Sequence, residues 1–138
     1  MAKSISKLKK ELDKWFSLFI RLRYATDYEG FCQCITCGKV GHYKSGGMQN
    51  GHFQSRRFMA TRYDEQNCFS QCVACNMFRG GEQFRFGLAI DSKYGEGTAQ
   101  ELEFLARTIV KFTRSDYEEK IGYYKAAVNK LKKDKGIE

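Results

Sequence analysis

The chain has 138 residues, with 24 lysines and arginines against 16 aspartates and glutamates, and so a formal net charge of +8. The length fits one domain, and an aromatic content of 14% argues against a disordered chain. No apolar run approaches the roughly 18 residues that span a bilayer, which excludes a transmembrane helix. The positive charge favours an anionic partner, nucleic acid before a membrane surface, although it could also serve only solubility.

The N-terminal ten residues are basic and lack the uninterrupted apolar stretch of a secretory signal peptide. We therefore expect a cytoplasmic protein, in which thiols stay reduced. Six cysteines in such a chain favour a metal site over disulfide bonds.

The segment from Ser4 to about Tyr24 is predicted to form a helix. Its apolar residues recur at the spacing of one helix face, and lysines and arginines occupy the other face. The apolar face predicts packing on the core, and the basic face is either solvated or in contact with phosphates. The apolar positions are Ile5, Leu8, Leu12, Trp15, Phe16, Phe19 and Ile20.

The middle of the chain, residues 30–81, contains all six cysteines and both histidines and has no sustained helical period. We expect short β segments and turns here, and a short helix that begins near Val73. With no repeat or linker that would mark a second domain, we expect one domain of three parts. These are a basic amphipathic helix within 1–29, a core at 30–81 and helices at 82–138.

The last part is predicted to contain three helices. Gln83–Tyr94 forms the first, and Gly95 ends it. Thr98-x-x-Glu101 and Ser115-x-x-Glu118 are capping-box signatures of two more, and the tail from Lys130 is expected to fray. Apolar residues follow the two boxes at helical spacing: Leu102, Leu105, Ile109 and Phe112, and then Tyr117, Ile121, Tyr124, Val128 and Leu131.

Two Cys-x-x-Cys pairs, Cys34/Cys37 and Cys72/Cys75, predict a zinc site. Two residues between thiolates let one turn present both sulfurs to an ion, and two such turns complete a tetrahedral four-thiolate site. Buried core cysteines or a redox pair are the alternatives, which two matched pairs disfavour. We interpret Cys32 and Cys68, which are left over, as core or incidental residues. A zinc closed by four thiolates is structural, so catalysis must use other residues.

The order His52, then Asn67, then Asn76 directly after Cys75 resembles the HNH, or ββα-metal, nuclease motif. More specifically, the chain resembles the NinG/Rap recombination nucleases of lambdoid phages over about residues 30–94. The stretches that carry the resemblance are Cys34-Ile35-Thr36-Cys37-Gly38, Gly51-His52-Phe53, Arg62-Tyr63-Asp64-Glu65-Gln66-Asn67 and Gln71-Cys72-Val73-Ala74-Cys75-Asn76. The resemblance implies an α+β fold in which N- and C-terminal helices flank a zinc-stapled ββα-metal (His-Me finger) core.

The resemblance also implies a metal-dependent endonuclease that acts on branched or recombination-intermediate DNA. His52 would be the general base, because a neutral imidazole accepts the proton of water near pH 7. Asn67 would hold the loop that carries this histidine, and Asn76 would bind a catalytic Mg²⁺ or Mn²⁺ through its amide oxygen. Symmetric cutting of a junction would need two active sites and so a homodimer, in the host cytoplasm if the protein is phage-encoded. The long apolar-faced helices could form that interface or simply close the core.

The sequence departs from the HNH motif at the carboxylate that usually stands directly before the catalytic histidine or three residues before it. Here these positions are Gly51 and Gln49. Gln49 could bind the catalytic ion through its neutral carbonyl oxygen, and Asp64 or Glu65 could contribute a carboxylate instead. The missing carboxylate keeps open a non-catalytic zinc module that binds DNA or protein. An HNH nicking nuclease with a different DNA substrate is a further alternative.

Five arginines lie around the motif and could bind flanking DNA phosphates, since guanidinium pairs bidentately with phosphate. The alternative is a solvated surface. Nothing resembles a base-reading helix, so we expect no sequence-specific recognition, and His42 has no motif context. The arginines are Arg56, Arg57, Arg62, Arg79 and Arg85.

Overall fold

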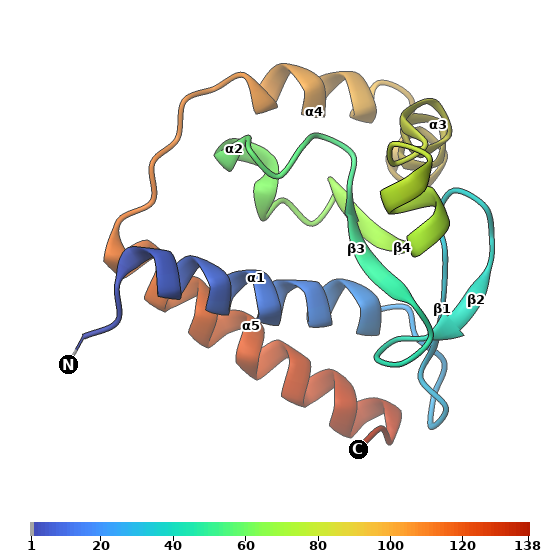
Figure 1. Ribbon diagram of the computed structural model, residues 1–138, viewed down its shortest axis with the longest axis horizontal. Helices are drawn as coiled ribbons and strands as arrows, with labels where there is room; N and C mark the ends of the chain where they lie inside the picture. The colour runs from blue at the N-terminus through green and yellow to red at the C-terminus, as the bar shows by residue number, and fades with distance from the viewer. Residues whose placement is uncertain (1) are drawn as a thin grey trace.

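Two long helices form one edge of the molecule (Figure 1). The computed structural model describes residues 2–138, and in it α1 covers Ile5–Leu22 and α5 covers Arg114–Lys135. Helix α1 begins after Ser4, whose hydroxyl accepts a hydrogen bond from the backbone N–H of Lys7. The predicted apolar face of α1 is buried at Leu8, Leu12, Phe16 and Ile20.

The apolar faces of α1 and α5 pack against each other. Phe16 meets Tyr124 edge to face, with 5.0 Å between the ring centroids, and Tyr63 closes the same cluster. Each buried side chain of this size contributes about 1.5–3 kcal/mol. Both faces are therefore used to close the core of this chain, which is one of the two alternatives left open by the sequence.

Two small antiparallel sheets follow α1. Strand β1 (Phe31–Gln33) pairs with β2 (Val40–His42), and β3 (Met48–His52) pairs with β4 (Cys68–Cys72). All five residues of β4 are buried, and the register places His52 opposite Cys68. In Figure 1 the β3–β4 pair lies between the α1–α5 edge and the remaining helices. These sheets and the flanking helices confirm the predicted α+β class.

Four shorter helical elements complete the fold. They are α2 (Met59–Arg62), the π-helical turn η1 (Ala74–Phe78), α3 (Gln83–Tyr94) and α4 (Thr98–Ala106). The short helix expected near Val73 and the helix expected at 83–94 are confirmed. Helices α3 and α4 enclose a further apolar cluster together with Phe69 of β4. Within residues 2–138 no helix is both long and apolar enough to cross a membrane.

Both predicted capping boxes were wrong. Helix α4 starts after Gly97, and the Thr98 hydroxyl donates to the Gly95 carbonyl 2.7 Å away. This helix ends at Ala106, so Ile109, which is 97% exposed, lies outside it; so does Phe112, in the connection to α5. The cap of α5 is Thr113, which exchanges reciprocal hydrogen bonds with Asp116.

The C-terminal tail is helical to Lys135 instead of frayed. The helix ends at Gly136 in the left-handed conformation, with φ 67°. The Lys135 ammonium donates to the Ala25 carbonyl 2.7 Å away, and Ile137 packs against a buried cluster. Tertiary contacts therefore hold the segment that sequence propensity left free.

Candidate functional site

The four predicted cysteines, Cys34, Cys37, Cys72 and Cys75, form one cluster. Their sulfur atoms all lie within 4.8 Å of one another, and the Cys37 and Cys72 sulfurs are 3.7 Å apart. Four zinc–sulfur bonds of about 2.3 Å in a tetrahedron place the sulfurs about 3.8 Å apart. The cluster therefore has the size of a zinc site.

Two local turns present these thiols. The first follows β1, where the Gly38 N–H bonds the Cys34 carbonyl at 3.0 Å and the Ile35 N–H bonds the Ser70 carbonyl of β4 at 2.9 Å. Burial alone would raise the pKa of Cys34, but hydrogen bonds from Thr36 and from backbone N–H groups lower it to about 6. This favours the thiolate, the form that binds metals, at Cys34. At Cys37 the Lys39 backbone N–H lowers the pKa, but burial and the three neighbouring cysteine sulfurs outweigh it and raise the pKa to about 12.

The two remaining cysteines lie outside the cluster. Both Cys32 and Cys68 are buried, as expected of core residues, and the Cys68 thiol lies 3.8 Å from the Arg62 carbonyl. Burial raises the pKa of both thiols, so they are neutral and part of the packing.

His52, at the end of β3, lines two adjoining cavities of about 360 and 420 Å³, which we call the groove. Its Nε2 lies 2.9 Å from the Arg62 carbonyl oxygen. Because a carbonyl only accepts, Nε2 carries the hydrogen and Nδ1 keeps its lone pair. Burial, assisted by the charges of Arg56 and Arg62, lowers the pKa of His52 to about 4. The imidazole is therefore neutral at pH 7.

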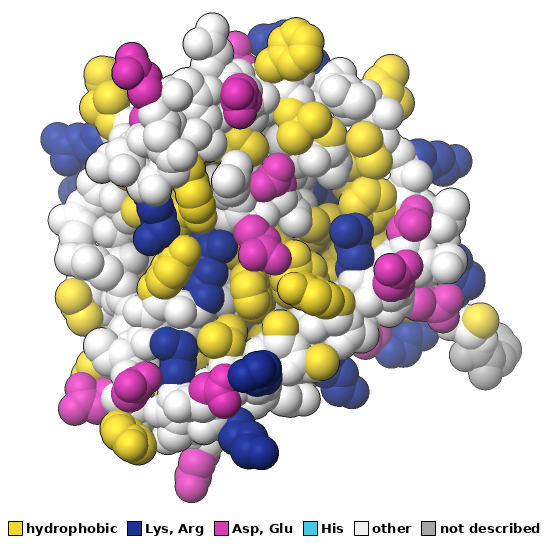
Figure 2. Space-filling view, turned by 180° about the vertical axis from the view of Figure 1, so that it is seen from behind, with side chains coloured by type: hydrophobic (Ala, Val, Ile, Leu, Met, Phe, Trp, Pro, Cys, Tyr) yellow, Lys and Arg dark blue, Asp and Glu magenta, His cyan; other side chains and the backbone are white. Residues whose placement is uncertain are grey.

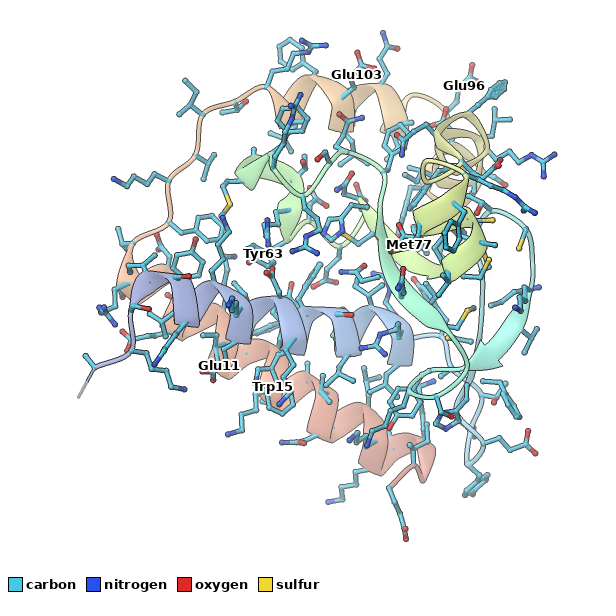
Figure 3. All side chains as sticks on the ribbon, in the orientation of Figure 1. Glu11, Trp15, Tyr63, Met77, Glu96 and Glu103 are labelled. Carbon is cyan, nitrogen blue, oxygen red and sulfur yellow. The ribbon has the colours of Figure 1, made fainter. Side chains whose placement is uncertain are left out.

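Figure 2 shows one face of the molecule, seen from behind relative to Figure 1. That face shows hydrophobic side chains between acidic and basic ones, and no histidine is visible on it. In Figure 3, Met77, which lines the first cavity, lies beside β3.

Asn67 is fully buried and holds the segment that follows His52. Its Oδ1 accepts from the Gln54 N–H at 2.7 Å. Its Nδ2 donates to the carbonyls of Gln54 and Thr61, both at 3.0 Å. The backbone carbonyl of Asn67 accepts from the Phe53 N–H at 2.8 Å. Asn67 thus fixes both ends of residues 53–61 against β4.

Three amide side chains line the first cavity of the groove beside His52: Gln49, Asn50 and Asn76. Asn76, in η1, donates from Nδ2 to Gln49 Oε1 at 2.7 Å, which leaves Asn76 Oδ1 free to accept. Within residues 2–138, Asn50 Oδ1 is buried without a hydrogen-bond partner. Neutral amide oxygens can bind a hard cation such as Mg²⁺. In this arrangement Asn76 offers a free oxygen, Gln49 Oε1 already accepts one hydrogen bond from Asn76, and Asn50 Oδ1 is enclosed away from solvent.

A family model described as the bacteriophage lambda NinG protein matches residues 1–134. The chain belongs to the NinG family. Two curated relatives, the ninG proteins of Escherichia phage 933W and Enterobacteria phage VT2-Sa, are 28% identical to it over 71 residues. The alignment covers 51% of this chain and 34% of each relative, so the match spans about a third of their length. No solved structure matches the chain.

In this NinG-family protein the position directly before His52 has no room for a carboxylate. A Cβ on Gly51 would overlap the Gln71 side chain, coming within 2.8 Å of its Cβ. Asp64 and Glu65 do not line the groove. Asp64 accepts from the Gln66 N–H, and Glu65 accepts from the Tyr124 hydroxyl, both at 2.9 Å. The two carboxylates that the sequence offered as ligands therefore stabilise a turn and the contact with α5.

The carboxylate that does line the groove is Asp13 of α1. Sequence reasoning missed it because no motif marks an acid on the polar side of a helix 39 positions before the histidine (52 − 13). Asp13 is already engaged, since it accepts hydrogen bonds from Arg62 and Tyr63.

The five candidate arginines divide into two groups. Arg62 is 7% exposed and bonds Asp13, so its assignment to a phosphate-binding surface is corrected: its guanidinium is committed inside the protein. Arg56 lines the groove with a side chain that is 63% exposed. Arg57, Arg79 and Arg85 are also exposed.

His42 has a local structural role. Its Nδ1 accepts from the backbone N–H groups of Lys44 and Ser45, both at 3.2 Å. These bonds stabilise the turn after β2. His42 does not line the groove, whereas His52 does.

Proposed function

We propose that this NinG-family protein is a metal-dependent DNA endonuclease of the HNH type that cuts branched or recombination-intermediate DNA. The observation that carries the proposal is the orientation of His52. Its Nε2–H bonds the Arg62 carbonyl, so Nδ1 is an unprotonated acceptor, and the residue lines a groove that amide side chains also line. A neutral imidazole held in one tautomer is what a general base needs.

The order of elements supports a ββα-metal interpretation of the core. Strands β3 and β4 are antiparallel, and the helical turn η1 follows β4 directly. His52 ends the first strand, Asn67 precedes the second, and Asn76 lies in the turn. The three motif residues, which are far apart in the chain, thus all belong to the unit formed by β3, β4 and η1.

In the proposed reaction, His52 Nδ1 accepts a proton from a water molecule. The water oxygen forms a bond to phosphorus, and the bond from phosphorus to the 3′ oxygen breaks. The leaving 3′ oxygen takes a proton from a solvent water, so the products are a 5′-phosphate and a 3′-hydroxyl, and His52 returns its proton to solvent. Mg²⁺ or Mn²⁺, held by the oxygens of Asn76 and Gln49, would supply stabilisation of the charge that develops on the phosphate. Arg56, exposed at the groove, pairs with a DNA phosphate. The zinc bound by the four cysteines holds the fold.

A second candidate is a non-catalytic zinc module that binds DNA or a protein. The observation that favours it is the charge of the groove: its lining carboxylate, Asp13, is occupied by Arg62 and Tyr63, and the other oxygen donors at Gln49, Asn50 and Asn76 are neutral. Such a site binds Mg²⁺ weakly unless the substrate phosphate completes the ligand set.

Cleavage of a four-way junction, a forked duplex and a linear duplex tests the proposal. Zinc-loaded protein is incubated with Mg²⁺, with Mn²⁺ and without an added divalent ion, because a chelator would also remove zinc. We expect cuts in the branched DNA only when Mg²⁺ or Mn²⁺ is added, with 5′-phosphate ends, and paired symmetric cuts indicate a homodimer. Protein that binds these DNAs and never cuts any of them is the non-catalytic module. Equal cutting of the linear duplex identifies a nuclease with a different substrate.

A further inference from the structure

A carboxylate of helix α1 reaches the loop that orients His52. Asp13 Oδ1 accepts from Arg62 Nε at 3.0 Å, and Asp13 Oδ2 accepts from Arg62 Nη2 at 2.5 Å. The Tyr63 hydroxyl donates to Asp13 Oδ1 at 2.7 Å. In Figure 3, Tyr63 lies on the side of α1 that faces the strands, and Trp15 lies on the opposite side. The bidentate pair of Asp13 and Arg62 joins residues that are 49 positions apart in the chain.

The guanidinium of Arg62 also holds its own loop. Nη1 donates to the Arg56 carbonyl at 2.7 Å, so a single side chain ties the start of the 56–62 segment to α1. Because Arg62 is 7% exposed, these bonds are shielded from water and are stronger than surface pairs.

The backbone carbonyl of the same arginine fixes the tautomer of His52. The Arg62 carbonyl accepts the His52 Nε2–H at 2.9 Å. The Arg62 side chain is one anchor of the residue that carries this carbonyl, beside the bond from the Arg62 N–H to the Phe58 carbonyl at 2.9 Å. The path from α1 to His52 is therefore one bidentate ion pair, one residue and one hydrogen bond.

We infer that Asp13 and Arg62 are positioning residues for His52, an inference that rests on the proposed function of His52 as the base. They keep the hydrogen on Nε2 and the lone pair of Nδ1 in the groove. When the pair is broken, the Arg62 carbonyl moves, and the imidazole exchanges between its two tautomers, only one of which can accept a proton from water in the groove.

The test is the isosteric variant Asp13→Asn, with two readouts. The first is cleavage of branched DNA: kcat falls about 10- to 100-fold, as expected for a misplaced catalytic group, while zinc content stays unchanged. The second is the ¹⁵N spectrum of the His52 ring, which shows one Nε2–H tautomer in the wild type and a mixture in the variant. The matched control is Tyr124→Phe, which removes a hydroxyl–carboxylate bond to Glu65 outside the groove and leaves both readouts at wild-type values.

A folded Asp13→Asn protein with an unchanged tautomer overturns the inference, and so does a loss of kcat no larger than that of Tyr124→Phe. If Asp13→Asn does not fold, Tyr63→Phe decides in the same way, because it removes only one of the hydrogen bonds to the Asp13 carboxylate and gives a smaller shift. If the wild type cuts no DNA, the proposed function fails, while the tautomer measurement still decides whether Asp13 positions His52.

Discussion

The four-cysteine cluster and the groove around His52 share the turn η1 but are assembled differently. Cys75 is buried in the cluster, and the next residue, Asn76, lines the groove. The cluster takes its ligands from two short turns. The groove takes its residues from α1, β3, the segment after β3, η1 and residues 80–83 at the start of α3. Because Cys75 and Asn76 are consecutive in η1, we expect loss of the cluster to displace a groove residue, whereas the groove contains none of the four cysteines.

Removal of zinc has the largest expected effect because it breaks both regions. A structural zinc contributes on the order of 10 kcal/mol to folding, comparable to the whole stability of a domain. Cys72→Ala is expected to lose the metal, which is otherwise about one zinc per chain, and cooperative unfolding with it. Metal analysis and thermal denaturation check this. Cys32→Ala, a buried cysteine outside the cluster, keeps zinc; zinc retained in Cys72→Ala contradicts the ligand assignment.

Loss of Asn67 is expected to weaken the groove while zinc remains bound. Asn67→Ala removes three side-chain hydrogen bonds and leaves the Gln54 and Thr61 backbone groups without partners, at a cost of about 3 kcal/mol. Urea denaturation measures the change in the free energy of unfolding. Asn129→Ala, on the exposed side of α5, changes it by less than about 0.5 kcal/mol. Equal values for the two variants would mean that the loop does not depend on Asn67.

Adding a carboxylate to β3 tests the groove independently of the four-cysteine cluster. Gln49→Glu keeps an acceptor for the Asn76 amide and adds a negative charge, so the Mg²⁺ concentration for half-maximal cleavage falls about tenfold. Gln66→Glu adds the same charge at an exposed position and leaves this concentration unchanged. An unaltered Mg²⁺ dependence in Gln49→Glu would place the catalytic ion elsewhere.

The smallest effect is expected at the rim of the groove. Arg56→Ala removes one phosphate contact, so DNA affinity falls a few-fold and the slope of log affinity against log salt concentration shrinks by about one. Fluorescence anisotropy over a salt series measures both quantities, and Lys133→Ala on α5 serves as the control. A slope identical to that of the wild type removes Arg56 from the DNA surface.

Features with a local spacing could be predicted from the sequence. The paired cysteines, the apolar faces of α1 and α5 and the helix at 83–94 depend on residues two to four positions apart, and the structure has all of them. The order of His52, Asn67 and Asn76 also pointed to one site, and the structure brings His52 and Asn76 to the same groove.

Features that depend on distant partners could not be predicted. Arg62 has the sequence context of a surface arginine until Asp13, 49 positions earlier, is placed beside it. The capping boxes failed for another reason: Thr113-x-x-Asp116 and Ser115-x-x-Glu118 overlap, both satisfy the pattern, and the extended connection from α4 selects Thr113. Local sequence patterns therefore predict several possible caps and surface residues, and tertiary contacts determine which of them occur in the structure.

The central claim is that zinc holds the fold and His52 carries the reaction. It is tested most directly by cleavage of branched DNA by His52→Ala at verified zinc content, with His42→Ala as the matched control. We predict that His52→Ala keeps about one zinc per chain and loses at least about 100-fold in cleavage rate, the contribution of a general base, and that His42→Ala cuts like the wild type. Wild-type cleavage by folded, zinc-bound His52→Ala protein would contradict the account.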